Sequence, residues 1–234
     1  MKGLWWKALT GVWTAVAVVV SIVYAPTSYG FTMHGNGAKI LFFHVPCAWF
    51  ACVGYIMGAV YGYKALRQMA STGWPSGAEN DRKSAVSMEL GLIFAVLATV
   101  SGSIFSRNEW GMYWSWDPRQ TSILVVLLLF CAYLVLRGSL AASDIRARLC
   151  GGYALIAVVP AIFIIWVLPR VVETLHGGAN QAVVGGGLTP AIRGVLYGCA
   201  LPAFVGIYTW LFQLGVRAHR LVAPRSEVTE VTRA

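Results

Sequence analysis

The residues best suited to do chemistry lie in one aromatic segment between two apolar stretches. From Trp110 to Trp116 the sequence WGMYWSW places three tryptophans, a tyrosine and a glycine within seven positions. An aromatic belt is one explanation, because Trp and Tyr favour membrane interfaces generally. The crowding favours a second explanation, because large rigid aromatic faces stack on a flat apolar ligand at low entropic cost. We predict that Trp110, Tyr113, Trp114 and Trp116 form such a platform.

Three of the four histidines lie in or beside the predicted external loops and could supply nitrogen ligands. His44 stands at the start of an apolar stretch, where it is anchored. His176 follows a short helix predicted to begin after Pro169 and to be stopped by glycine. Glu173 would then share a helical face with His176, where it either orients the imidazole or makes a surface contact. His34 lies in a glycine-flanked stretch and is the weaker candidate.

The residues after the aromatic segment predict the start of a helix. Asp117 is expected to be the N-cap, with Pro118 at the first helical position and Gln120 completing a variant of the capping box. Arg119 gains nothing from the helix dipole there. It is either a snorkelling residue or the partner of a ligand carboxylate. His219, in the C-terminal tail, is expected to be solvated.

Haem is the ligand that this combination predicts. It offers an apolar macrocycle, an iron that takes axial nitrogen ligands, and two propionates that need countercharges. His44 and His176 are the candidate iron ligands. The cations near them in the external loops are Lys39, Arg119, Arg170 and Arg193.

Six apolar stretches must position these residues. Of the 234 residues, 58% are hydrophobic and 12% charged, with a mean hydropathy of +0.66, which argues against a soluble domain. Each stretch approaches or exceeds the roughly 20 residues that cross a bilayer. The predicted spans are 8–25, 40–63, 85–106, 119–137, 150–168 and 193–215. We expect an all-α, single membrane domain over residues 1–234, with external loops at about 26–44, 107–119 and 169–192.

The charge distribution predicts the orientation of these spans. Of the 18 Lys and Arg, 13 fall on the side that holds both termini and five on the other. The positive-inside rule therefore places both termini in the cytoplasm. Stretch 8–25 is interpreted as a span rather than a cleaved signal peptide. The cations form no dense patch, which argues against nucleic-acid binding as the use of the +9 charge.

Several kinds of chemistry are excluded by what the sequence lacks. It contains no Cys-x-x-Cys and no Cys-x-x-Cys-His, which disfavours thiol exchange and covalent haem attachment. It contains no phosphate loop, so any ATP-driven work belongs to another chain. No acid, base or nucleophile constellation suggests an enzyme. The cysteines are expected to be small buried hydrophobes; they are Cys47, Cys52, Cys131, Cys150 and Cys199.

The segment 110–122 resembles the tryptophan-rich WWD signature of haem-handling membrane proteins. Together with 43–49, FHVPCAW, and 174–176, TLH, it resembles the CcmC family of cytochrome c maturation. The resemblance implies haem b held non-covalently on the periplasmic face of the bacterial inner membrane, with His44 and His176 as axial ligands. It also implies an ABC-type complex with CcmA, CcmB and CcmD, and haem transfer to the chaperone CcmE. Two departures are Lys39, where an arginine is expected, and Tyr113, where a tryptophan is expected.

Three other functions stay open at this point. The Trp-Asp-Pro run is also similar to that of the haem lyases CcmF and CcsA, which need more spans and more histidines. A membrane cytochrome b with bis-histidine haem would need histidines paired within the bilayer, whereas His44 and His176 are predicted at one surface. A haem permease is only weakened by the lack of polar residues inside the spans.

Overall fold

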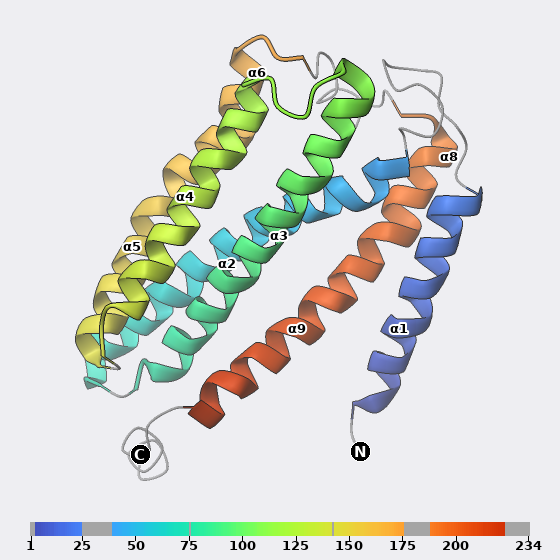
Figure 1. Cartoon of the computed structure of the whole chain (residues 1–234). Coiled ribbons are helices and arrows are strands. Elements are labelled where there is room, and N and C mark those ends of the chain that lie inside the picture. The colour runs from blue at the N-terminus through green and yellow to red at the C-terminus, as the bar shows by residue number, and fades with distance from the viewer. Residues whose placement is uncertain (1–2, 25–38, 75, 142, 176–187, 223–234) are drawn as a thin grey trace.

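The computed structural model describes residues 3–24, 39–74, 76–141, 143–175 and 188–222, and in these ranges it is helical with no strand (Figure 1). The predicted all-α class is confirmed. Six helical segments are long and apolar enough to cross a membrane: Leu4–Val23, Leu41–Thr72, Ala78–Trp110, Pro118–Gly138, Asp144–Val171 and Pro190–Val222. The chain is therefore a multi-pass membrane protein. The first helix starts and the last ends at the same end of the bundle, as an even number of spans requires.

The helices are α1 (Leu4–Val19), α2 (Leu41–Thr72), α3 (Ala78–Trp110), α4 (Pro118–Gly138), α5 (Asp144–Ile162), α6 (Leu168–Val171), α8 (Pro190–Arg193) and α9 (Leu201–Val222). Three π-helical segments widen the spans at the end of the bundle that carries α6 and α8: Val20–Tyr24, Phe163–Val167 and Gly194–Ala200. Each is followed within two residues by a proline in the sequence, at 26, 169 and 202. Proline clashes with the carbonyl four residues back, and a wider turn relieves that clash.

Helices α2, α3, α5 and α9 run well beyond the predicted spans. Helix α2 continues to Thr72 and α3 begins at Ala78, so most of the predicted loop between 63 and 85 is helical. Apolar length sets where a span must end, but the backbone stays helical until a residue stops it. Here the stop is Gly73, whose φ of 76° lies outside the helical region.

The core lies between α2, α3, α4, α5 and α9. Helices α2 and α3 touch through backbone, because a Cβ built on Gly54 would lie 2.5 Å from the Cα of Gly91. Small residues permit this approach in membrane bundles, where close packing stabilises helix pairs. The rings of Tyr55 and Phe130, both buried, fill the adjoining space.

A buried ion pair joins α3 to α4. Arg137 donates from both terminal nitrogens to Asp81, at 2.9 and 2.7 Å, and the side chains are 10% and 4% exposed. The predicted spans leave Asp81 in the connection between 63 and 85 and Arg137 at the end of a span, and they do not reveal this pair. The bidentate geometry holds the two helices in register.

Two sequence predictions about polar side chains are wrong. His219 is not simply solvated: its Nε2 lies 3.0 Å from the carboxylate of Glu89, so α9 is fastened to α3. Among the cysteines, Cys47, Cys52 and Cys150 are buried as expected, but Cys131 is exposed and Cys199 half-buried. The sequence shows neither which face of α4 carries Cys131 nor that α9 crosses α3 near Glu89.

Candidate functional site

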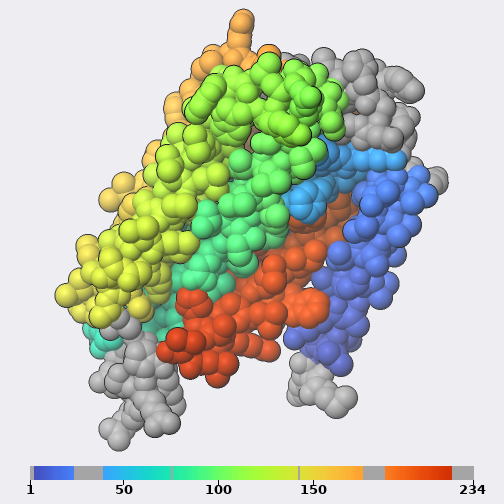
Figure 2. Space-filling view, in the orientation of Figure 1, coloured from blue at the N-terminus to red at the C-terminus, as the bar shows by residue number. Residues whose placement is uncertain are grey.

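The aromatic segment forms a short connection between α3 and α4 that is exposed at one end of the bundle (Figure 2). The predicted loop, 107–119, is too long at both ends. Arg107 and Trp110 belong to the last turn of α3, and α4 begins at Pro118, which leaves 111–117 as the loop. Gly111, with a φ of 77°, ends α3 in the left-handed conformation that glycine adopts without strain.

The four predicted platform residues are not equivalent. Tyr113 is 62% exposed and Trp116 is 68% exposed, although the Arg107 guanidinium lies over the Tyr113 ring, 5.7 Å from its centroid. Trp114 is half-buried and packs edge-on against Trp116, with ring centroids 5.7 Å apart. Trp110 packs edge-on against Phe105 of its own helix. Trp116 also has a φ of 57°, an unusual conformation for a bulky residue, and such strain concentrates at functional sites.

A polar cluster holds the loop against both helices. Gln120 Oε1 accepts from the backbone N–H of Ser115 at 2.7 Å, and its Nε2 donates to Ser106 Oγ at 3.1 Å. Ser106 in turn donates to the carbonyl of Met112 at 2.7 Å. The predicted capping-box role of Gln120 is therefore wrong, because its side chain bonds to the loop rather than to the N-cap residue.

Asp117 is the N-cap of α4, as predicted, and it also binds the chain that follows α6. One carboxylate oxygen accepts from Arg119 N at 2.9 Å, and the other accepts from Leu175 N at 2.5 Å. The predicted short helix after Pro169 is wrong in extent, since α6 ends at Val171 and Glu173 is not helical.

The shared helical face predicted for Glu173 and His176 is therefore lost. His176 itself lies outside the described residues, as do His34, most of the predicted loop 26–44 and half of the predicted loop 169–192. What the structure does place is Leu175, the residue before His176, which is bonded to the cap of the aromatic loop.

Two nitrogen-bearing side chains near the loop have buried donors. These donors are Nε and Nη2 of Arg119 and Nε1 of Trp114. None of the three atoms has a hydrogen-bond partner among the described residues. The Arg119 charge interacts favourably with Asp117 and unfavourably with Arg170. Buried donors normally have a hydrogen-bond acceptor, and a bound ligand is one group that could supply it here. These donors suit an anionic group.

The other predicted cations are placed differently. Lys39 Nζ donates to the carbonyl of Ile22 at 2.7 Å and so fastens the end of the first span. Arg170 lies over the ring of Trp166, 5.2 Å from its centroid, and donates to the carbonyl of the same residue. Arg193 is exposed in α8. Of the four cations, Arg119 alone has buried donors without a partner among the described residues.

His44 sits in the first turn of α2, half-buried against α3, which confirms its predicted place at the start of a span. Its Nδ1 lies 3.0 Å from Ser101 Oγ. An imidazole held in this way by one nitrogen can present the other to a metal.

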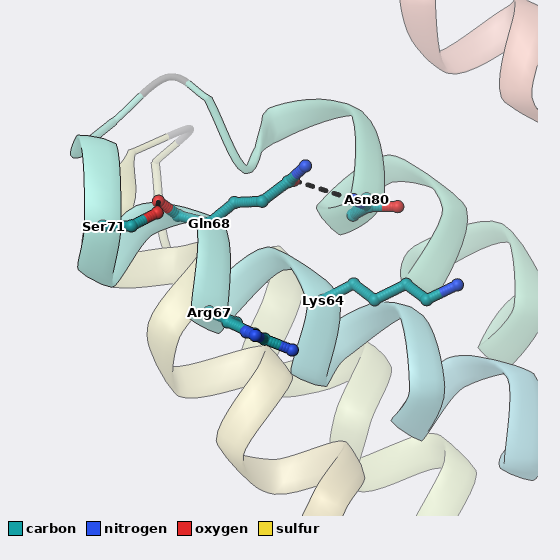
Figure 3. Close-up of a pocket in the computed structure, with 5 residues that line it drawn as sticks. All are labelled: Lys64, Arg67, Gln68, Ser71 and Asn80. Carbon is teal, nitrogen blue, oxygen red and sulfur yellow. Dashed lines mark hydrogen bonds between the residues drawn. The ribbon is translucent and has the colours of Figure 1, made fainter.

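A pocket of about 220 Å³ opens at the opposite end of the bundle, between α2 and the start of α3 (Figure 3). It is lined by Lys64, Arg67, Gln68, Ser71 and Asn80, and Asn80 Nδ2 donates to Gln68 Oε1 at 2.8 Å. Basic side chains at this end fit a surface that meets lipid phosphates. The pocket is remote from the aromatic loop.

A family model described as "CcmC: Heme exporter protein C" matches residues 2–233. The chain belongs to this family. It is 31% identical over 184 residues to heme exporter protein C of Bradyrhizobium diazoefficiens, a match that covers 78% of this chain and 65% of that protein. It is 30% identical over 192 residues to heme exporter protein C of Escherichia coli K12, which covers 79% and 73%.

A putative ccmC-like mitochondrial protein of cytochrome c biosynthesis from Arabidopsis thaliana is 30% identical over 131 residues, or 55% of this chain and 47% of that protein. The chain thus spans slightly less than two thirds of the Bradyrhizobium relative and about half of the plant one. The family match confirms the resemblance stated above.

Proposed function

We propose that this protein binds haem b non-covalently at the end of the bundle that carries the aromatic loop, and transfers it onward for cytochrome c maturation. The observation that carries the proposal is the juxtaposition of exposed aromatic rings with buried, unsatisfied donors. Tyr113 and Trp116 offer stacking area for a macrocycle, while Arg119 offers a bidentate fork for a propionate. The relatives named as heme exporters support the same ligand.

The iron would be held by His44 and His176. His44 is anchored in α2, and the chain before His176 is bonded to Asp117, which caps the aromatic loop. Lys39 contributes to a propionate contact in this proposal only if it leaves the carbonyl of Ile22. Trp114 would support the platform, since it packs edge-on against Trp116, and Trp110 would hold the end of α3 through its contact with Phe105.

In this proposal the protein is a binding and transfer module rather than an enzyme. The partners would be the chaperone CcmE and an ABC-type complex of CcmA, CcmB and CcmD. The haem site would face the periplasm and both termini the cytoplasm of a bacterial inner membrane.

The specific competitor is a haem lyase of the CcmF or CcsA kind. Such a lyase would need more membrane spans than this protein has. The described residues form six membrane-length helices, and the heme exporter family match covers nearly the whole sequence. A bis-histidine cytochrome b is also disfavoured, because His44 sits at the very start of α2 rather than in the middle of a span.

The test is the spectrum of protein purified from a haem-replete host. We expect low-spin, six-coordinate iron that acid-acetone extracts completely, because the sequence contains no haem-attachment motif. His44→Ala and His176→Ala should each shift the iron toward five-coordinate high spin, and His34→Ala should have no effect. Haem that stays with the chain after extraction contradicts non-covalent binding. A change of coordination in His34→Ala but not in His176→Ala contradicts the ligand assignment.

A further inference from the structure

The imidazole of His44 packs against two consecutive residues of α3. Ser101 Oγ lies 3.0 Å from Nδ1. At the next position, a Cβ built on Gly102 would come within 2.9 Å of the His44 Cε1 atom and 3.4 Å of Nδ1. The Cε1 atom of the ring therefore lies so close to α3 that a side chain at position 102 would displace the imidazole.

The hydrogen bonds of Ser101 decide which ring nitrogen carries the proton. A serine hydroxyl has one hydrogen and two lone pairs. Ser101 Oγ lies 2.7 Å from the carbonyl of Leu97 and 3.2 Å from that of Ala98, and both groups can only accept. The hydroxyl hydrogen is therefore directed at the backbone, and Oγ must accept from His44. In the neutral imidazole this places the proton on Nδ1 and the lone pair on Nε2.

We infer that Ser101 and Gly102 are positioning residues that hold His44 in the Nδ1–H tautomer and so make Nε2 its ligating nitrogen. The inference rests on the proposed function for its consequence in haem binding. A ligating histidine whose other nitrogen donates a hydrogen bond is fixed in orientation and made more basic. The same helix that ends in the aromatic loop thereby also sets the ring that faces the iron.

The tautomer can be measured without haem. In protein from a haem-deficient host, labelled with ¹⁵N-histidine, long-range ¹H–¹⁵N correlation spectra distinguish Nδ1–H from Nε2–H, and His44→Ala identifies the signal. We expect wild type and Ser101→Thr to show Nδ1–H, and Ser101→Ala to shift toward Nε2–H. The matched control is Thr99→Val, which deletes a hydroxyl bonded to the carbonyl of Ala95 on the same helix without touching His44. A proton on Nε2 in wild type, or an unchanged spectrum in Ser101→Ala, overturns the inference.

The haem-loaded protein provides the second readout. Loss of the hydrogen bond makes the imidazole a weaker donor to ferric iron, so the midpoint potential of Ser101→Ala should rise above wild type. Ser101→Thr and Thr99→Val should keep the wild-type potential, and Gly102→Ala should lose the six-coordinate spectrum because the ring is displaced. An unshifted potential in Ser101→Ala overturns the inference. If wild type shows Nδ1–H but binds no haem, the proposed function fails while the positioning of His44 stands.

Discussion

Two arginines of α4, one near each end of the helix, show how partner choice decides the effect of a buried charge. Arg137 makes a bidentate pair with Asp81, and both side chains are almost fully buried. Arg119 has two guanidinium nitrogens buried without a partner among the described residues, and it is repelled by Arg170. The first arginine is satisfied by the protein, and the second by a ligand in our proposal.

The two arginines should therefore respond in opposite ways to loss of charge. Arg137→Met leaves the Asp81 carboxylate buried and alone, and we expect it to lower the free energy of unfolding by roughly 3–5 kcal/mol. Arg119→Met removes unsatisfied donors, so stability should be unchanged or higher while haem retention falls. Denaturant unfolding in detergent and haem content per chain check both. Normal haem retention in Arg119→Met would rule out a propionate contact.

The platform residues differ in how far their rings are exposed, so their substitutions should have different effects. Trp116→Ala removes ring area of the order of 150–250 Å² from a residue that is 68% exposed, so haem retention should fall with little change in stability. Trp110→Ala removes a ring that packs on Phe105, and should lower stability more than Trp116→Ala does. Haem content and thermal unfolding of the two variants distinguish these effects. Unchanged haem content in Trp116→Ala would make the aromatic segment an interfacial belt only.

At the scale of elements, the aromatic loop is shaped by side chains from the two helices that it connects. Gln120 of α4 and Ser106 of α3 bond to each other and to the loop, while Asp117 bonds to the start of α4 and to Leu175. The aromatic loop and the residues before His176 thus form one unit. A ligand that contacts both the aromatic loop and the chain near His176 would therefore bind to two segments that are already hydrogen-bonded to each other.

Asp117 and Ser143 are a matched pair for testing this unit. Both are N-caps whose side chain accepts from a first-turn backbone N–H, so Asp117→Ala and Ser143→Ala should each cost about 0.5–2 kcal/mol of stability. Asp117→Ala alone should also release Leu175, lower haem retention and expose residues near 175 to protease. The measurements are unfolding, haem content and limited proteolysis. Equal haem retention in the two variants would contradict a tether between the loops.

At the scale of the whole molecule, charge and packing differ between the two ends and across the bundle. The end with the pocket lined by Lys64 and Arg67 is basic, and the other carries the aromatic loop. Across the bundle, the apolar window of the first span is 11% buried, against 56% for that of α2, so α1 is a peripheral helix packed chiefly on α9.

The orientation that the positive-inside rule predicts can be tested with single cysteines. Met112→Cys, at a residue 49% exposed in the aromatic loop, should react with a membrane-impermeant maleimide added to intact spheroplasts. Ser71→Cys, exposed at the basic end, should react only after permeabilisation. Both are made in a chain whose five native cysteines are replaced. The opposite labelling pattern would invert the proposed topology.

The sequence by itself determined the number of spans, the aromatic loop, the cap at Asp117 and the histidine at the start of the second span. These are local properties: apolar length, capping chemistry and residue type depend on neighbours along the chain. Only the tertiary structure decided that Arg137 pairs with Asp81, that His219 reaches Glu89, that Gln120 holds the loop rather than a cap, and that Ser101 seats His44. These contacts join residues on different elements. Which side chains meet there is set by the crossing and rotation of packed helices, and no periodicity within one helix encodes that.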